Sequence, residues 1–382
     1  MLISPASRMA GVQKSIIRQI FEAAQGKAIN LGLGEIQFDT PLIIRELAAK
    51  VAGTENCRYT LNAGTLELRR QIAAYYEQKV NVEGICVTCG AAEALHSCFT
   101  SYVNPGDEVM IADPTFLAYE ASIRINGGTV VRYRLDPEHD FALDREDFRS
   151  KISSKTKIVM ICNPSNPLSK CLSIEELEFM AEECRKHGSL IISDEIYREL
   201  TYIERQPSML DIYDDTIIVS GISKSHCMTG WRIGWAASSN ADYIKTIVVA
   251  HQYQSTCAPY ISQRAAELAM SEKGLATISE IKSQLVANRD FIISYFQKNL
   301  PELEYLKPDA APYLFINVKG CDKEFSRKAA AEGVIVIPGS AFGPGSTGWI
   351  RISYALNREL LSRALTILVK LLTQVSQLRF EL

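Results

Sequence analysis

Residues 216–237 read TIIVSGISKSHCMTGWRIGWAA: an apolar run, a polar stretch containing Ser223 and Lys224, and a second apolar run. The runs 216–220 and 231–237 are short and rich in β-branched and aromatic residues, which is typical of buried strands. In an open α/β sheet, ligands bind beyond the carboxyl ends of the strands. The polar stretch therefore predicts a ligand site at the end of a strand.

The same alternation extends on both sides of this stretch, from about residue 85 to 240. It predicts an α/β fold whose large domain has a mainly parallel seven-stranded sheet covered by helices on both faces, because nearly all the strands are apolar. The expected strands are 85–88, 108–112, 129–135, 157–162, 190–193, 216–220 and 231–237. The expected helices are 91–103, 115–126, 144–153 and 173–187.

After about residue 240 the pattern changes to long helical segments followed by shorter strands. Helices are expected at 259–271, 277–299, 322–332 and 357–375, and strands at 313–318, 334–337 and 350–354. Apolar residues between 12 and 21 recur at helical spacing, which favours a packed helix over a targeting segment. We therefore predict a large domain over 41–275 and a smaller α+β domain formed by 1–40 and 276–382.

Composition excludes several classes of protein. The 382 residues include 41 basic and 44 acidic ones, so the net charge is −3, and no nucleic-acid or anionic membrane partner is indicated. No uncharged apolar run approaches the ~18 residues of a spanning helix. The ten cysteines mostly lie in apolar segments, which favours reduced thiols in the cytoplasm. Cys86 and Cys89 have the spacing of a redox or zinc half-site, but no second pair accompanies them, so no metal is expected.

Polar or aromatic residues follow four of the predicted strands, and a turn that opens a helix follows the strand at 85–88. Each has an ordinary structural explanation when taken alone: a turn, a helix cap, a core ring or a surface lysine. Together they suit one ligand. A helix start, a serine and an arginine suit a phosphate; an aromatic ring, Asn, Asp and Tyr suit a flat heteroaromatic; and a lysine suits a Schiff base with an aldehyde. This set predicts pyridoxal 5′-phosphate (PLP) as the cofactor and comprises Ala91, Ala92, Phe116, Asn166, Asp194, Tyr197, Ser223, Lys224 and Arg232.

Ser223-Lys224 followed by residues 228–234 (MTGWRIG) resembles the PLP-lysine signature of the class I/II aminotransferases, in the aspartate aminotransferase superfamily. The resemblance covers nearly the whole chain, from residues 33–35 (LGE) and 38–41 (FDTP), through 59–64, to 350–355 (IRISYA).

The resemblance implies a role for each matching residue. Lys224 would hold PLP as a Schiff base and move the Cα proton, with Asp194 on the pyridine nitrogen and Tyr197 and Asn166 on the phenolic oxygen. Phe116 would stack on the ring, and Ser223, Arg232 and the amides of Ala91 and Ala92 would bind the phosphate. Tyr59 would reach the neighbouring subunit's phosphate, which implies a homodimer with shared sites. Arg351 would bind the substrate α-carboxylate with help from the backbone near Gly34, and Asn166 would line the substrate site.

Cys227 stands where the signature has a small residue, and Leu168-Ser169 replaces the usual Thr/Ser-Gly, which puts substrate preference in doubt. An arginine such as Arg351 is often a structural ion-pair partner, but the surrounding motif favours carboxylate binding. His226 is interpreted as a neighbour of the site and not as the base, since Lys224 has that role.

The expected activity is transfer of an amino group from an amino acid to a 2-oxo acid by a ping-pong mechanism. The motif leaves open a PLP-dependent elimination or replacement lyase, which uses the same residues. A transcription regulator with an aminotransferase-like sensor would need a DNA-binding extension. A nicotinamide enzyme would need G-x-G-x-x-G after the first strand, and neither feature is found.

Overall fold

Eight strands form the central sheet of the computed structural model, which describes residues 3–4, 6–14, 16–23 and 28–377. Their order is β2-β9-β8-β7-β6-β3-β4-β5. Only β9 and β5 run antiparallel to their neighbours. The strands are β2 (Ile85–Thr88), β3 (Glu108–Asp113), β4 (Thr129–Asp136), β5 (Ala142–Leu143), β6 (Thr156–Cys162), β7 (Leu190–Asp194), β8 (Thr216–Gly221) and β9 (Gly234–Ala237).

The α/β class and the mainly parallel sheet are confirmed, and one strand is added to the predicted seven. Asp140 and Phe141 have φ values of 53° and 58° and turn the chain back after β4. Ala142 and Leu143 then pair antiparallel with the end of β4. Two residues are too short to show a period-2 pattern, so the sequence did not indicate this strand.

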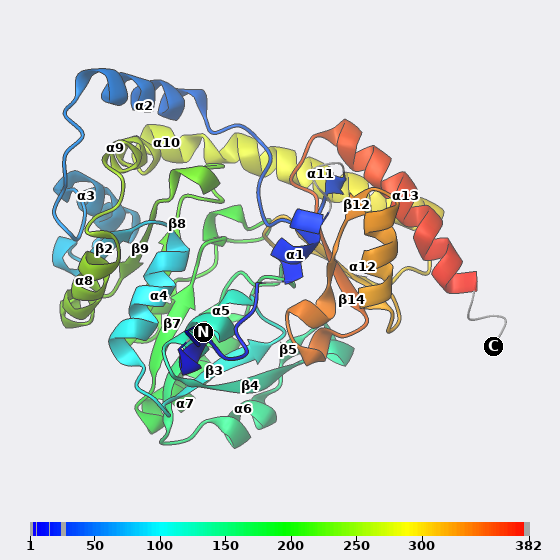
Figure 1. Cartoon of the computed structure of the whole chain (residues 1–382), viewed down its shortest axis with the longest axis horizontal. Coiled ribbons are helices and arrows are strands. Elements are labelled where there is room, and N and C mark those ends of the chain that lie inside the picture. The colour runs from blue at the N-terminus through cyan, green and yellow to red at the C-terminus, as the bar shows by residue number, and fades with distance from the viewer. Residues whose placement is uncertain (1–2, 5, 15, 24–27, 378–382) are drawn as a thin grey trace.

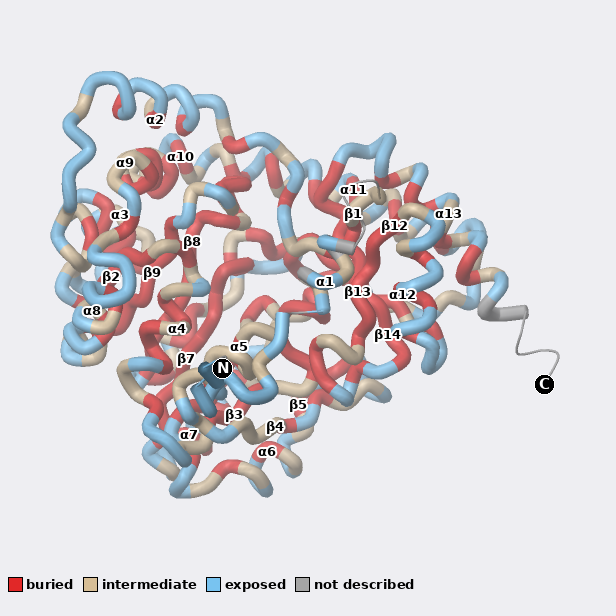
Figure 2. Tube along the Cα trace, in the orientation of Figure 1, coloured by how far each residue is buried: buried red, intermediate tan, exposed pale blue. Residues whose placement is uncertain are grey.

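Helices cover both faces of the sheet (Figure 1). One face packs against α4 (Ala91–Tyr102), α5 (Ala118–Ile125) and α8 (Ala241–Ser255). The other face packs against α2 (Leu42–Thr54), α3 (Leu66–Tyr75), α6 (Arg145–Lys151), α7 (Ile174–His187) and α9 (Tyr260–Ala269). Strands β2, β7 and β8 are buried on both faces (Figure 2), as their continuous apolar runs predict.

A smaller part of the molecule is built on a four-stranded antiparallel sheet of order β10-β11-β14-β13. The strands are β10 (Tyr305–Leu306), β11 (Tyr313–Asn317), β13 (Ile337–Pro338) and β14 (Trp349–Ser353). β1 (Ile29–Asn30) pairs in parallel with β12 (Val334–Ile335), so the N-terminal segment joins this part. The remaining helices of the described residues are α1 (Ile16–Ala23), α10 (Glu272–Ala276), α11 (Ile278–Asn299), α12 (Asp322–Ala331) and α13 (Arg358–Gln377).

The small part has its own apolar core, to which α11 and α13 contribute Leu285, Ile292, Phe296 and Leu365. In Figure 1, α11 runs from the large part across to the small part, where it contacts α13, and α13 in turn contacts α12. The domain boundaries at 40/41 and 275/276 stay predictions. The predicted small domain also includes residues 1–2, 5, 15, 24–27 and 378–382, which lie outside the described residues.

Next to the candidate active site, one strand and one helix begin later in the chain than predicted. Strand β9 begins at Gly234 and not at 231, because Thr229–Trp231 form a 3-10 turn and Arg232 is left-handed, with φ 56°. Helix α5 begins at Ala118 and not at 115. Along the described chain, no helix combines the length and the apolar character needed to cross a membrane.

Candidate active site

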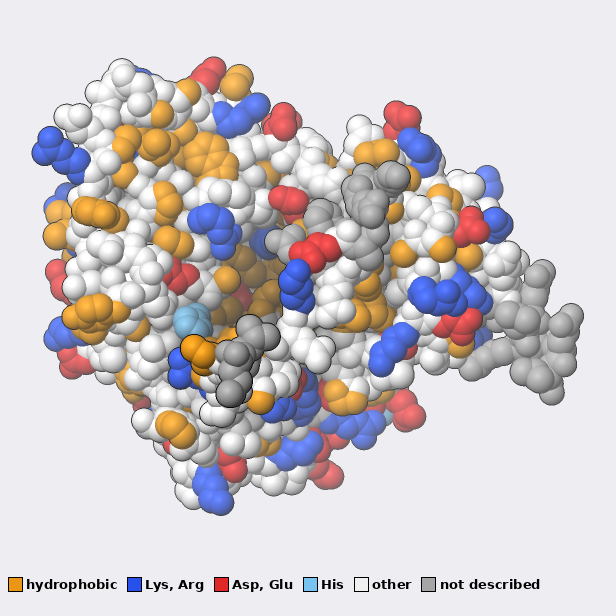
Figure 3. Space-filling model, viewed as in Figure 1, with side chains coloured by type: hydrophobic (Ala, Val, Ile, Leu, Met, Phe, Trp, Pro, Cys, Tyr) orange, Lys and Arg blue, Asp and Glu red, His pale blue; other side chains and the backbone are white. Residues whose placement is uncertain are grey.

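A cavity of ≈ 700 Å³ lies between the two parts, at the carboxyl ends of the parallel strands. Figure 3 shows the surface hollowed there, with hydrophobic side chains visible inside. The structure brings together in this cavity all but one of the residues predicted for the site. Those that line it are Gly34, Ala91, Ala92, Phe116, Asn166, Asp194, Tyr197, Ser223, Lys224, Arg232 and Arg351.

One end of the cavity is built to receive an anion. Gly90, with φ 89°, turns the chain from β2 into α4, and a helix start leaves N–H groups such as those of Ala91 and Ala92 without helical acceptors. Arg232 lies against this turn and donates to the carbonyls of Cys89 (3.2 Å) and Thr229 (2.8 Å). A side chain on Gly90 would collide with the Arg232 guanidinium, so the turn and the arginine require glycine here.

Asp194, at the end of β7, is a buried carboxylate in a fixed orientation. The Tyr119 hydroxyl donates to its Oδ2 at 2.8 Å, and the Ile196 N–H donates to Oδ1 at 3.1 Å. Burial raises the pKa of Asp194 to about 6, although both hydrogen bonds and the Lys224 charge act in the opposite direction. No ion-pair partner of this carboxylate is found among the described residues, so it can accept a cation.

Lys224 follows β8 and extends into the cavity, where its Nζ donates to the Gly34 carbonyl at 2.5 Å. Burial, and after it the positive charge of Arg351, lower the pKa of Lys224 to about 8. A substantial fraction of this amine is therefore neutral near physiological pH, and a neutral amine is a nucleophile and a base.

Arg351 in β14 is a buried cation, with only 1% of its surface exposed. It donates from Nη1 to Asn166 Oδ1 (2.7 Å) and from Nη2 to the Gly32 carbonyl (2.5 Å), while its Nε has no hydrogen-bond partner. The rings of Tyr313 and Phe342 lie 4.3 and 4.9 Å from its guanidinium carbon. No carboxylate among the described residues pairs with it, and burial lowers its pKa. An anion entering the cavity would supply the missing charge.

Comparisons with known proteins give the same family as the lysine signature. Residues 26–368 match the family model "Aminotransferase class I and II". The chain belongs to the class I and II aminotransferases. It is 34% identical to the putative aminotransferase YugH of Bacillus subtilis, over 93% of this chain and 94% of that protein. It is also 34% identical to a probable aspartate aminotransferase of Methanocaldococcus jannaschii, over 95% and 98%.

Solved structures of aminotransferases share the whole fold. The Thermus thermophilus aspartate aminotransferase with maleate superposes with a TM-score of 0.91 at 28% identity, covering 97% of this chain and 100% of that one. The aminotransferase fold of this chain, with its large mixed sheet and smaller antiparallel sheet, is thereby confirmed.

Tyr59 is the one predicted site residue that lies away from its own chain's cavity. Its side chain is 85% exposed, in the loop between α2 and α3. The Asn62 side chain in the same loop donates to the Thr256 carbonyl at 2.8 Å, next to the end of α8. In this aminotransferase Tyr59 is thus available to a second subunit, and its predicted role there stays a prediction.

The two departures from the signature lie outside the cavity wall. Leu168 is buried in the core of the large part, and the Ser169 carbonyl accepts from the N–H groups of Asp309 and Ala310. Cys227 has φ 55° and accepts from the Thr40 hydroxyl through its carbonyl at 2.8 Å. None of these side chains lines the cavity. Any effect of these departures on substrate preference would therefore have to be indirect.

His226 and the Cys86–Cys89 pair do not line the cavity of this aminotransferase. His226 is buried outside the cavity, beside Ser225 Oγ at 2.9 Å, and burial lowers its pKa to about 4, so it is neutral. Burial raises the pKa of Cys86 strongly and that of Cys89 to about 11, which keeps both thiols protonated. The described residues hold no cluster of metal-ligating side chains.

Two tyrosines of the site were not predicted from the sequence. Tyr119 lies in the first turn of α5 and orients Asp194 through its hydroxyl. The Tyr313 hydroxyl is 2.6 Å from that of Tyr197 and faces Gly34, where any side chain would collide with it. It comes from β11 of the small part, and nothing in the sequence connects that strand to residue 197.

Proposed function

We propose that this chain is a PLP-dependent aminotransferase that moves an amino group from an amino acid to a 2-oxo acid by a ping-pong mechanism. One observation carries the proposal: the same cavity holds a buried anion, Asp194, and a buried cation, Arg351, and neither has an ion-pair partner among the described residues. A protonated pyridine nitrogen and an amino-acid carboxylate have the charges that complete these two half-sites.

The residues present fit the cofactor. The N-terminal turn of α4, with Ser223 and Arg232, suits its phosphate, and a side chain at Gly90 would displace Arg232 from that turn. Phe116 is proposed to stack on the ring, and Tyr197 and Asn166 to bind the phenolic oxygen. When bound, PLP supplies an aldehyde that condenses with amines and a ring that stabilises negative charge at the substrate Cα.

The chain's own residues would carry out the remaining tasks. Asp194 holds the proton of the ring nitrogen, because an ionised carboxylate favours the charged form of a partner base. Arg351 orients the substrate by its α-carboxylate, assisted by the backbone at Gly34. Lys224 would hold the cofactor covalently through Nζ, and as a free amine it would move the proton of the substrate Cα. We propose that the enzyme is a homodimer in which the partner subunit's Tyr59 completes the phosphate site. The cytoplasmic location stays a prediction.

The test is a half-reaction on purified holoenzyme without an acceptor. Adding an amino acid should change the visible absorbance of the cofactor and release one oxo acid per site, with no ammonia. Ammonia release would indicate a lyase instead. Parallel double-reciprocal plots would support the ping-pong order.

Lys224→Ala should lose at least about 10³-fold in turnover, because the covalent anchor and the proton carrier are the same amine. Lys245→Ala is the matched control, since Lys245 pairs with Asp242 on the surface of α8. Normal activity in Lys224→Ala would contradict the assignment.

A further inference from the structure

We propose, resting on the function above, that Tyr313 is a positioning residue of this site: its hydroxyl donates to Tyr197, so that Tyr197 donates to the phenolic oxygen of the cofactor, and its ring supports Arg351. The two hydroxyl oxygens lie 2.6 Å apart, and the centroid of the Tyr313 ring lies 4.3 Å from the guanidinium carbon of Arg351. Tyr313 thus contacts a residue proposed to bind the cofactor and a residue proposed to bind the substrate.

The contact between the two tyrosines joins the two parts of the molecule. Tyr197 follows β7 of the large part, and Tyr313 is the first residue of β11, where it pairs with Ser353 of β14. Both tyrosines line the cavity, yet only 3% of the Tyr197 surface and none of the Tyr313 surface is exposed. The contact is therefore formed within one subunit, and a second subunit has no access to it.

The chemistry of the two hydroxyls decides which of them donates when the cofactor is bound. A tyrosine hydroxyl has one proton to donate and can also accept. Burial raises the pKa of both Tyr197 and Tyr313, so both keep their protons at neutral pH. If Tyr197 gives its proton to the phenolic oxygen, the proton in the 2.6 Å contact has to come from Tyr313. Hydrogen bonds in such a chain polarise one another, so donation by Tyr313 strengthens donation by Tyr197.

The Tyr313 hydroxyl is held in place by its surroundings. Its ring meets the Tyr197 ring edge to face, with centroids 5.7 Å apart and an interplanar angle of 80°, an arrangement that aromatic pairs prefer. The hydroxyl also fills the space where a side chain of residue 34 would lie, so a tyrosine at 313 requires Gly34. The Gly34 carbonyl accepts from Lys224 Nζ at 2.5 Å, so the hydroxyl lies beside the segment that holds the proposed covalent anchor.

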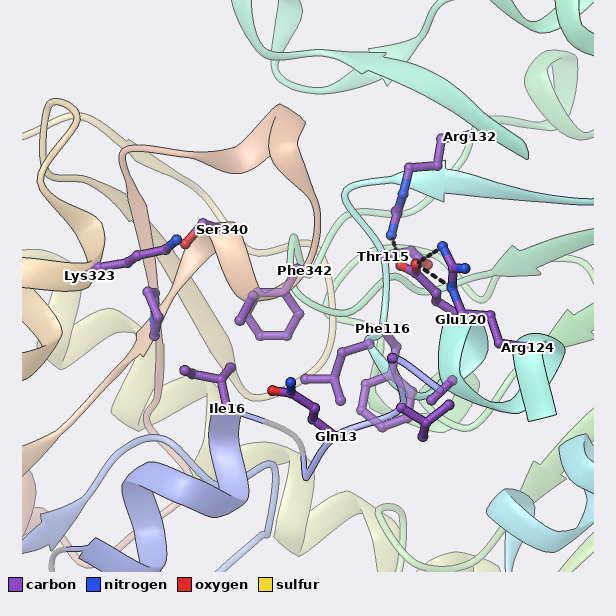
Figure 4. Close-up of a pocket in the computed structure, with 16 residues that line it drawn as sticks. Gln13, Ile16, Thr115, Phe116, Glu120, Arg124, Arg132, Lys323, Ser340 and Phe342 are labelled. Carbon is purple, nitrogen blue, oxygen red and sulfur yellow. Dashed lines mark hydrogen bonds and ion pairs between the residues drawn. The ribbon is translucent and has the colours of Figure 1, made fainter. Parts of the chain in front are cut away.

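Arg351 contacts a second aromatic ring, but that ring cannot replace Tyr313. The Phe342 ring lies 4.9 Å from the guanidinium carbon and has no polar atom. Phe342 also lines a second cavity, of ≈ 380 Å³, where Figure 4 shows it together with Phe116. Of the two rings that contact Arg351, only that of Tyr313 carries a hydroxyl that reaches Tyr197.

The test uses the pH dependence of the cofactor's visible absorbance in holoenzyme. A hydrogen bond donated to the phenolic oxygen stabilises its ionised form and so lowers the pH at which the absorbance changes. Tyr313→Phe should raise the midpoint by about half a pH unit, because it removes the hydroxyl that strengthens donation by Tyr197. Tyr197→Phe should raise the midpoint by more. An unchanged midpoint in Tyr313→Phe would overturn the inference.

A double variant separates action through Tyr197 from a direct effect on the cofactor. Tyr197→Phe combined with Tyr313→Phe should have the midpoint of Tyr197→Phe alone, because Tyr313 acts only through the Tyr197 hydroxyl. Shifts that add would show that Tyr313 acts independently and would overturn the inference. Tyr213→Phe is the matched control and should keep the native midpoint, since this tyrosine is also buried but donates to the Ser189 carbonyl, at 3.0 Å, outside the cavity.

Titration of cofactor-free protein with PLP gives a second readout. Tyr313→Phe should raise the dissociation constant by about threefold, and Tyr213→Phe should leave it unchanged. Native protein that takes up no PLP would refute the proposed function itself. Native protein that binds PLP, with a Tyr313→Phe variant that matches it in both readouts, would refute the inference and leave the aminotransferase function intact.

The contribution of the ring is tested by two variants at the same position. Tyr313→Phe keeps the ring against Arg351 and should leave KM for the amino acid within about twofold of the native value, whereas Tyr313→Leu should raise KM by about tenfold, the value of a buried cation–π contact. Equal KM values in the two variants would overturn the part of the assignment that concerns Arg351. Tyr313→Met, which also lacks the ring but fills more of its space, replaces Tyr313→Leu if that variant does not fold.

Discussion

At the scale of single residues, the pKa of Lys224 gives a pH dependence that an ordinary lysine would not show. Condensation with an aldehyde needs the neutral amine, which predominates above the pKa. With a pKa of about 8, the rate at which cofactor-free protein takes up PLP should rise from pH 6 to 9 with a midpoint near 8. A lysine with the usual pKa of about 10.4 would still be rising at pH 9.

Arg351 is the second cause of this low pKa, after burial. Arg351→Met should therefore move the midpoint to higher pH, whereas Arg363→Met, which removes a charge from the exposed surface of α13, should not. A midpoint that stays in place in Arg351→Met would show that Arg351 does not contribute to the low pKa of Lys224.

Asp194 offers a second prediction for a single side chain. Asp194→Asn keeps the size and the acceptor for Tyr119 but removes the charge that holds a proton on the ring nitrogen. Turnover should fall by at least about 10²-fold. Tyr119→Phe removes one hydrogen bond, of 2.8 Å, to the same carboxylate. Its turnover should fall by much less. Equal losses in the two variants would mean that orientation, and not charge, is the contribution of Asp194.

At the scale of the element, the start of α4 is supported by hydrogen bonds of Glu93. Glu93 accepts from the Cys89 N–H through Oε2 (2.5 Å), and its Oε1 is 3.0 Å from Nδ1 of His251 in α8. Burial acts to raise the pKa of Glu93, but hydrogen bonds from His251, Ser255 and Cys89 outweigh it and lower the pKa to about 2. Glu93 therefore stays ionised, and it does not line the cavity.

This contact predicts a difference between two Glu93 variants. Glu93→Ala removes the acceptor for the Cys89 N–H and should weaken PLP binding by about tenfold, because the phosphate turn loses its support. Glu93→Gln keeps an acceptor and should bind PLP almost as well as native enzyme. Equilibrium titration of cofactor-free protein measures both constants, and equal affinity in all three proteins would exclude a positioning role.

The elements that the sequence predicted are those whose cause is local. Apolar runs and helical spacing marked the seven longer strands of the central sheet and most of the helices, but α2, α3, α8 and α10 were not predicted. The strand ends marked nine of the residues that meet in one cavity, and the family resemblance added Gly34 and Arg351. Three other features that were missed depend on long-range contact: β5 needs the turn at Asp140, Tyr313 reaches Tyr197 from another sheet, and Glu93 meets His251 across two helices. For Leu168 the sequence suggested a place near the substrate, but this changed motif residue lies in the core and not at the site.

At the scale of the whole molecule, the large part carries an apolar surface around α2, α3 and α8. Exposed hydrophobic side chains there are Leu42, Ile43, Tyr59, Leu61, Leu66, Val249 and Tyr253, and Figure 3 shows hydrophobic side chains gathered over the region of α2 and α9. Patches of this kind mark protein interfaces. The exposed Tyr59 lies within it, so the surface suits the proposed homodimer.

Two substitutions separate assembly from cofactor binding. Leu61→Glu buries a charge in the proposed interface and should give monomers in sedimentation experiments, whereas Ile174→Glu, at an exposed apolar site on α7, should stay dimeric. Tyr59→Phe keeps the ring and should stay dimeric, but it removes the hydroxyl proposed for the partner's phosphate. Its PLP dissociation constant should rise by about tenfold, the value of one hydrogen bond to a charged group. A dimeric Tyr59→Phe protein that binds PLP as tightly as native enzyme would show that the subunits associate without sharing their sites.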